Sequence, residues 1–254
     1  MTKANRCVCL TIDVEWAHKD VLAELIKALD ERRIPATFFC THAEIDVGEH
    51  ERAIHPNFRW SGDSVQKTGG LVPIADLDED AVNADVVRET LSFCPEAVGA
   101  RAHYLRSDTS VFRAYMNAGL VYDSSYLALF GADLVPYELP FGLIEMPIYY
   151  MDHFDIINGL TGFRSSDLRL DSGGMKVLDF HPNMIFSNAP SDAFYQGLRA
   201  QYHDPAAMIA NRFEGRGIRD LFFEVLDELA AASYPVLTLK ERATGAEWRE
   251  AKGR

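Results

Sequence analysis

The chain has 254 residues, of which 48% are hydrophobic and 25% are charged, and its formal net charge is −13. This composition excludes a disordered chain, a collagen-like repeat and a disulfide-stapled mini-protein. The negative charge also argues against binding to nucleic acid, which normally requires a basic surface.

Apolar segments alternate between strand-like and helix-like spacing from the start of the chain. A run rich in β-formers at 6–12 precedes a helical pattern at 21–29, and a second strand is predicted at 36–41. Later strands are predicted at 98–102, 120–122, 143–149, 176–180 and 236–239, and later helices at 79–93, 108–117, 193–200 and 217–232. Long loops are predicted at 42–77 and 127–141. The alternation predicts a single α/β domain over residues 1–254, with a barrel-like core over about 6–240 and a polar C-terminal tail.

The N-terminal segment and the apolar runs bear on location. No run approaches the ~18 uninterrupted apolar residues of a transmembrane helix. The first residues lead into Asp13 and Glu15 instead of a signal-peptide core. The cysteines have no zinc-ribbon or CxxC spacing; they are Cys7, Cys9, Cys40 and Cys94. We therefore expect a cytoplasmic protein with reduced thiols and no transmembrane segment. The sequence does not specify its oligomeric state.

Two carboxylates directly follow the first predicted strand. In an extended chain residues i and i+2 point to the same side, so Asp13 and Glu15 are expected to converge while Val14 faces the core. The carboxyl ends of parallel strands form the active-site rim of α/β barrels. The alternative role for these acids is to cap the helix that begins near His18, although His18 or Asp20 could also cap it.

The tripeptide His-Pro-Asn occurs twice, at 55–57 and at 181–183. A lone histidine is more often a structural group than a ligand. Two such tripeptides are difficult to attribute to packing. Neutral imidazoles near paired carboxylates are suited to a divalent metal or to general acid–base chemistry.

Several short motifs follow Asp13 in a recognisable order. They are Pro-Ala-Thr-Phe-Phe at 35–39, His-Glu-x-x-x-His at 50–55, Arg-x-x-Tyr at 101–104, Tyr-Asp-Ser-Ser at 122–125 and Leu-x-x-His-Pro at 178–182. This order resembles the polysaccharide deacetylase family, which is carbohydrate esterase family 4 with its NodB-homology domain. The resemblance covers about residues 8–240 and implies a distorted (β/α) barrel with fewer than eight regular strands.

The resemblance also implies a metal-dependent hydrolase that removes an acetyl or formyl group from the nitrogen of an amino sugar. It implies that Asp13 is the general base and that Arg101 keeps Asp13 ionised and oriented. It implies that the backbone N–H of Tyr104 stabilises the oxyanion and that His181 protonates the departing amine.

The implied metal is Zn²⁺ or another divalent ion, but the ligand pattern of the family is incomplete here. Val14 stands where the family has a metal-binding aspartate, and Arg59 stands where it has a second histidine. A hydrolytic zinc site usually has three protein ligands and one open position. We therefore predict that Glu15, His55 and His103 hold the metal. The competing role for His103, which takes the place of a proline in the third motif, is contact with the substrate alone.

Three further residues have expected roles outside the proton transfers and the metal site. Asp123 loosely represents the fourth motif, whose usual role is to tune the general acid, and we predict that Asp123 and Trp60 contact the substrate. His50 precedes an acidic position of the second motif and is expected to be structural.

Two other functions stay open. One is a metal-independent amidase of the same fold that acts on a cyclic ureide or another small amide. The other is an inactive, deacetylase-like protein that binds carbohydrate, with Trp16, Trp60 and Trp248 available to stack on sugars. Without an export signal, the expected substrate is a small-molecule, nucleotide-linked or lipid-linked saccharide precursor, and the choice between acetyl and formyl is not predicted.

Overall fold

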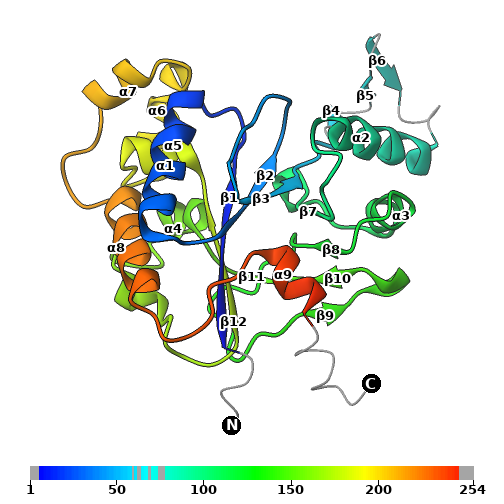
Figure 1. The fold of residues 1–254 in the computed structure, drawn as a ribbon. Coiled ribbons are helices and arrows are strands. Elements are labelled where there is room, and N and C mark those ends of the chain that lie inside the picture. The colour runs from blue at the N-terminus through cyan, green and yellow to red at the C-terminus, as the bar shows by residue number, and fades with distance from the viewer. Residues whose placement is uncertain (1–5, 59, 62–63, 68–69, 74–77, 246–254) are drawn as a thin grey trace.

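The computed structural model describes residues 6–58, 60–61, 64–67, 70–73 and 78–245, with the side chains of 60–73 outside the description. At its centre is a curled sheet of nine strands (Figure 1). In spatial order they are β11 (Ile148–Met151), β12 (Met175–Phe180), β1 (Cys7–Asp13), β2 (Ala36–Cys40), β3 (Glu51–Ile54), β7 (Gly99–Ala100), β8 (Tyr122–Asp123), β10 (Ile144–Glu145) and β9 (Tyr137–Glu138). A separate small sheet contains β4 (Trp60–Ser61), β5 (Ser64–Lys67) and β6 (Gly70–Pro73).

The sheet confirms the predicted distorted (β/α) barrel. Four of its strands, β7 to β10, are only two residues long, so the regular part of the barrel is confined to the other five. All pairings from β11 to β10 are parallel, and only the edge strand β9 runs antiparallel. The carboxyl ends of the parallel strands therefore meet at one end of the barrel.

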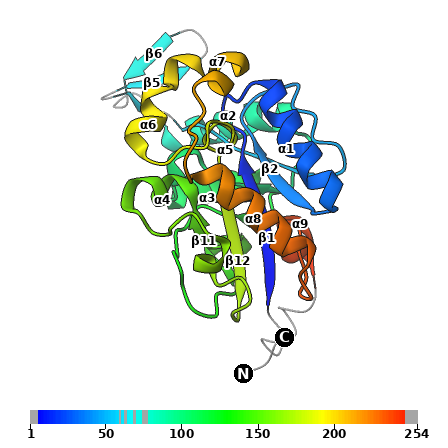
Figure 2. The same cartoon turned by 90° about the vertical axis from the view of Figure 1, so that its left-hand side faces the viewer.

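Most helices lie outside this sheet, as expected for β–α–β connections, whereas the last helix packs Leu239 and Ala243 against the interior residues Cys7 and Cys9. The helices are α1 (Lys19–Arg32), α2 (Glu79–Phe93), α3 (Thr109–Asn117), α4 (Asp152–Asn158), α5 (Pro182–Ser187), α6 (Asp192–Gly197), α7 (Pro205–Ala210), α8 (Ile218–Ala230) and α9 (Leu239–Thr244). Helices α1, α5 and α8 pack together over β1 and β12 (Figure 2), and α2 packs against α3 beside β7 and β8 (Figure 1). The N-cap of α1 is His18, whose Nδ1 accepts the N–H of Asp20 at 3.2 Å, so Asp13 and Glu15 are not used as caps.

Strand β1 has two buried faces of different character. Val8, Leu10 and Ile12 join the apolar cluster beneath the helices. Cys7 and Cys9 face the interior of the barrel. Because side chains alternate along a strand, Thr11 and Asp13 continue the interior row. Strand β12 repeats this pattern, with apolar interior residues first and then Asp179 and His181. The interior of the barrel therefore becomes polar towards the carboxyl ends.

The predicted loop at 42–77 is wrong in part, because it contains β3 and the small sheet. Strand β3 begins with Glu51 and Arg52, and two charges in succession conceal a buried strand. The charge on Glu51 is accommodated because its carboxylate accepts hydrogen bonds from the hydroxyls of Thr37 and Tyr122, both at 2.7 Å.

Other predicted boundaries also differ. The predicted strand at 236–239 is wrong: Val236 forms one isolated bridge to Val8, and α9 begins at Leu239. The predicted loop at 127–141 contains β9. Helices α4, α5 and α7 have six or seven residues, which is too short for a helical period to be recognised in the sequence.

The four cysteines are buried with free thiols. Over the described ranges, no helix has both the length and the apolar character to span a membrane.

Candidate active site

The polar residues at the carboxyl ends of the strands form one buried cluster. Asp13 ends β1, His55 follows β3, Arg101 follows β7 and His181 follows β12. All four side chains are at least nine-tenths buried. They come from distant parts of the sequence, and the parallel sheet is what places them together.

Arg101 is the centre of this cluster and is fully buried. Its Nη1 donates to Oδ1 of Asp13 at 2.8 Å and to Oγ1 of Thr11 at 2.9 Å. Its Nε and Nη2 donate to the backbone oxygen and the hydroxyl of Ser124 at 2.8 and 2.9 Å. Its guanidinium carbon lies 4.2 Å from the centre of the Phe39 ring, a cation–π distance. The guanidinium of Arg101 is therefore hydrogen-bonded through each of its nitrogens and contacts Asp13 directly.

Asp13 is ionised in this environment. Burial by itself would raise the pKa of its carboxyl group, but the positive charge of Arg101, with smaller contributions from His55 and His181, lowers the pKa to about 2. A carboxylate with this pKa is available as a proton acceptor at neutral pH.

The hydrogen bonding of His55 fixes which of its nitrogens can bind a ligand. Its Nδ1 lies 2.8 Å from the backbone oxygen of Arg101, and since a carbonyl only accepts, Nδ1 carries the proton. Burial lowers the pKa of His55, so the ring stays neutral and Nε2 keeps its lone pair. That Nε2 lies 3.2 Å from Nδ1 of His103 and 3.7 Å from Oδ2 of Asp13. This arrangement is typical of metal-binding histidines, whose second nitrogen is held by a carbonyl.

The structure brings Glu15, His55 and His103 together. One oxygen of Glu15 and one nitrogen of each histidine lie within 4.8 Å of one another. Nδ1 of His103 is 3.4 Å from Oε1 of Glu15. Two imidazole nitrogens and one carboxylate form a donor set that fits Zn²⁺ with room for a further ligand.

The convergence does not arise from an extended strand, as the sequence had predicted. Glu15 is not on an extended strand beyond Asp13, because β1 ends at Asp13 and Glu15 has a φ of 49°. His103 also lies off the strand, in the 3₁₀ turn η3 (His103–Leu105), where Tyr104 has a φ of 59°. Left-handed backbone at residues other than glycine is strained, and such residues cluster at functional sites. The residue types could be predicted from the sequence, but the turns that aim them could not.

A second group of possible ligands, Asp13, Asp179 and His181, also lies within 4.8 Å. Arg101 donates to both of its carboxyl groups. A divalent cation placed beside this guanidinium would be repelled by it. The second group therefore does not fit a metal.

His181 has a partner that the sequence analysis missed. Oδ1 of Asp152 lies 2.6 Å from Nδ1 of His181, and Oδ2 accepts the backbone N–H of His181 at 2.7 Å. Burial disfavours a charged ring, but Asp152 outweighs this effect and raises the pKa of His181 well above its usual value. Nε2 of His181 lies 3.9 Å from Oε1 of Glu15. The His181 proton therefore faces the proposed ligand cluster. The sequence signal for Asp152 was its place directly after an apolar strand.

Asp123, the residue of the fourth motif, is not the acid that pairs with His181. It is fully buried, and its Oδ1 accepts the hydroxyl of Ser125 at 2.7 Å. Its neighbour is the buried carboxyl group of Glu145. Asp123 is therefore enclosed rather than presented to a substrate, and Asp152 is the acid that contacts His181.

The Asp123–Glu145 pair predicts a specific pH dependence of stability. Burial raises the pKa of Asp123 to about 6 and that of Glu145 well above its usual value. Between the unfolded and folded pKa values the folded chain binds more protons, so the pair makes stability fall as the pH rises. The free energy of unfolding of Glu145→Gln, measured with urea at pH 5 and pH 8, is expected to fall less between these pH values than that of the parent. At pH 8 the variant is expected to be about 1–3 kcal/mol more stable than the parent. The exposed-site variant Glu89→Gln is the control, and parallel pH profiles for Glu145→Gln and the parent would contradict the assignment.

Two exposed aromatic side chains border the cluster. Tyr104 is 77% exposed and Trp16 is 43% exposed. Both rings contact His103 edge to face, with centroid distances of 4.2 and 5.4 Å. On the other side, His153 contacts the ring of His181 at 5.9 Å. The cluster is therefore open to solvent along a rim of aromatic and imidazole rings.

His50 lies outside the cluster, and the side chains of the other remaining predicted residues are not among those described. His50 is structural, as expected: its side chain is buried against Phe38, and Nε2 lies 3.4 Å from Oδ1 of Asp30. The side chain of Trp60, together with Arg59 and Trp248, lies outside the described residues.

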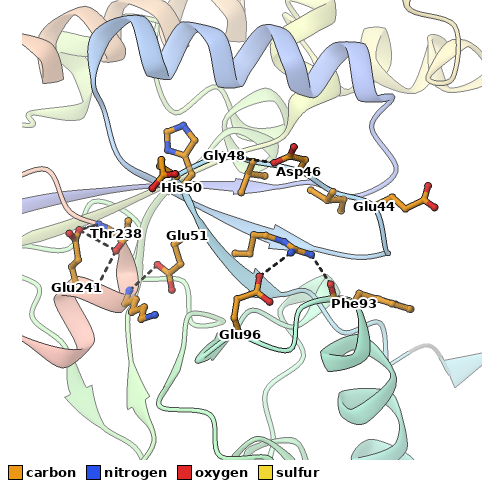
Figure 3. Close-up of a pocket in the computed structure, with 14 residues that line it drawn as sticks. Glu44, Asp46, Gly48, His50, Glu51, Phe93, Glu96, Thr238 and Glu241 are labelled. Carbon is orange, nitrogen blue, oxygen red and sulfur yellow. Dashed lines mark hydrogen bonds and ion pairs between the residues drawn. The ribbon is translucent and has the colours of Figure 1, made fainter.

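A pocket with a volume of about 770 Å³ lies at the other end of β3 (Figure 3). Residues 44–52, the end of α2 and the start of α9 line it. His55 follows Glu51 of the pocket by four positions of extended chain, about 13 Å along the strand. The hydrogen bonds drawn in Figure 3 connect residues that line the pocket to one another, such as Arg52 with Glu96 and Thr238 with Glu241. The pocket contains none of the clustered catalytic candidates, so we do not assign the chemistry to it.

Comparison with known proteins agrees with this geometry. The family described as WbmS-like polysaccharide deacetylase matches residues 10–199. A solved structure from Bordetella bronchiseptica, named as a polysaccharide deacetylase involved in O-antigen biosynthesis, is 24% identical with a TM-score of 0.74, covering 87% of this chain and 90% of that one. A structure named as a polysaccharide deacetylase from Mycobacterium smegmatis is 17% identical with a TM-score of 0.60, covering 97% and 91%. At these identities the two structures show a shared fold. No curated protein matches the chain.

Proposed function

Since the chain belongs to the WbmS-like polysaccharide deacetylase family, we propose that it is a metal-dependent hydrolase that removes an N-acyl group from an amino sugar. The observation that carries the proposal is the convergence of Glu15, His55 and His103 beside the ionised Asp13. These three residues would hold Zn²⁺ or another divalent ion. Bound there, the ion would lower the pKa of a water molecule and polarise the acyl carbonyl.

The side chains of this protein would carry out the proton transfers. Asp13, held by Arg101, takes the proton of the attacking water. His181 holds a proton on the side that faces Glu15, and Asp152 keeps its ring in that orientation. Transfer of this proton to the nitrogen allows the amine to leave, because an amine anion is too basic to depart.

The turn at Tyr104 supports the same reaction. Its backbone adopts the left-handed conformation directly after His103, beside the proposed metal ligands. We assign the backbone N–H of Tyr104 to the developing oxyanion, where a fixed donor contributes to the rate.

The aromatic rim supports a saccharide substrate. The side chains of Trp16 and Tyr104 are exposed next to His103, and aromatic rings pack well against the apolar faces of sugars. By analogy with the Bordetella neighbour, whose name refers to O-antigen biosynthesis, the proposed substrate is a nucleotide-linked or lipid-linked precursor of a surface polysaccharide.

Release of the acyl group tests the proposed function. The protein, stripped with a chelator and then reloaded with Zn²⁺, is incubated with N-acetyl and N-formyl amino sugars linked to a nucleotide or a lipid. We expect acetate or formate release by the reloaded protein and none by the stripped protein.

The alternatives give different results in this assay. Equal release by the stripped protein would indicate a metal-independent amidase. Saccharide binding without release from any substrate would indicate an inactive carbohydrate-binding protein. Either result would overturn the proposed function.

A further inference from the structure

The cluster contains a second buried carboxyl group beside Asp13, which the proposed reaction does not use. Asp179 lies opposite Thr11 in the register of β12 and β1 and is fully buried. Its Oδ1 accepts hydrogen bonds from Oγ1 of Thr11 at 3.1 Å and from Nη1 of Arg101. The same Nη1 donates to Asp13. One guanidinium nitrogen therefore serves two carboxyl groups.

The two carboxyl groups differ at their second oxygen. The side chain of Asp13 is 3% exposed, and its Oδ2 lies 3.7 Å from the unprotonated Nε2 of His55, on the side of the proposed metal ligands. Oδ2 of Asp179 is buried and has no hydrogen-bond partner among the described residues. A buried charged oxygen without a donor is far more costly than a neutral hydroxyl without an acceptor. The geometry therefore favours a proton on Asp179 rather than on Asp13.

The surrounding charges also favour a proton on Asp179 rather than on Asp13. Arg101 carries one positive charge and cannot neutralise two carboxylates. Burial, together with the negative charges of Asp13 and Asp152, raises the pKa of Asp179 well above its usual value, against the opposing effects of Arg101 and His181.

We propose that Asp179 is a neutral carboxylic acid that positions Arg101, so that Asp13 alone carries the negative charge of the pair. Asp179 is a positioning residue, since its contacts are to Thr11 and Arg101. The expected effect of Asp179 on turnover rests on the proposed function, in which Asp13 is the base. The protonation state of Asp179 is independent of that function.

Matched substitutions of the two aspartates test the positioning role. An amide has the shape of a neutral acid and keeps the oxygen that Arg101 and Thr11 use, so Asp179→Asn is expected to keep kcat/KM within about fivefold. Asp179→Leu removes that acceptor and is expected to lose about tenfold to hundredfold. Asp13→Asn, the same change on the other side of Arg101, is expected to lose about 10²–10⁴-fold.

Infrared difference spectroscopy tests the protonation state without any substrate. At pH 7.5 the wild-type protein minus Asp179→Asn is expected to show the C=O band of a protonated carboxylic acid. If Asp179→Asn does not fold, Asp179→Leu provides the same comparison.

The results separate this inference from the proposed function. A carboxylate band for Asp179 would overturn the inference whatever the activities are. An acid band combined with a loss in Asp179→Asn as large as that in Asp13→Asn would overturn the positioning role. Full activity of Asp13→Asn would refute the proposed base, while the infrared result would still decide the state of Asp179.

Discussion

Asp13→Asn is expected to abolish turnover while the chain keeps its fold and its capacity to bind metal. Asparagine preserves the shape of the side chain and its contact with Arg101, which lies 2.8 Å away, but it cannot accept a proton. The expected loss in kcat is about 10²–10⁴-fold, the usual contribution of a general base. Steady-state kinetics with the N-acyl sugar that the reloaded protein hydrolyses provides the measurement.

The control for this prediction is Asp46→Asn. Asp46 is exposed, and its carboxylate accepts the N–H of Gly48, a bond that asparagine can also accept. We expect Asp46→Asn to behave as the parent. If Asp13→Asn retained more than a few per cent of the parental rate, Asp13 would not be the base.

His181→Ala is expected to lower kcat about 10²–10⁴-fold and to change KM little, because the proton is needed only as the C–N bond breaks. Asp152→Asn is expected to act in the same direction but less strongly, since it removes the charge that orients and protonates His181 without removing the ring. The measurement is kcat and KM for both variants, with the exposed-site variant His203→Ala as the control. An effect of His181→Ala confined to KM would contradict the role of general acid.

Much of the fold could be predicted because its local patterns agree with its global arrangement. The buried strands β1, β2 and β12 are continuous apolar runs, and α8 has a clear helical period. Strand β3 could not be predicted, because the carboxylate of Glu51 is accommodated by tertiary partners, namely the hydroxyls of Thr37 and Tyr122 and the backbone N–H of Lys240. A sequence pattern does not record partners of this kind.

Only some residues of the candidate site could be predicted from the sequence, for a related reason. Asp13, His55 and His181 stand at strand ends, where a parallel sheet brings them together. Asp179 was missed because it lies within an apolar strand, where a carboxyl group is not expected to be buried. Asp152 was missed because the fourth motif points to Asp123, and a short motif does not specify which acid reaches the histidine.

The central claim is that Glu15, His55 and His103 hold a divalent metal, and zinc content tests it most directly. The wild-type protein, His55→Ala and His103→Ala are loaded with Zn²⁺, desalted and analysed for bound metal, with circular dichroism to verify the fold and His50→Ala as a control outside the site. Removing one of three ligands from a zinc site strongly weakens it. We predict near-stoichiometric zinc in the wild type and in His50→Ala, and loss of zinc in both His55→Ala and His103→Ala. Undiminished zinc in folded His103→Ala, with loss in His55→Ala, would contradict the assigned ligand set.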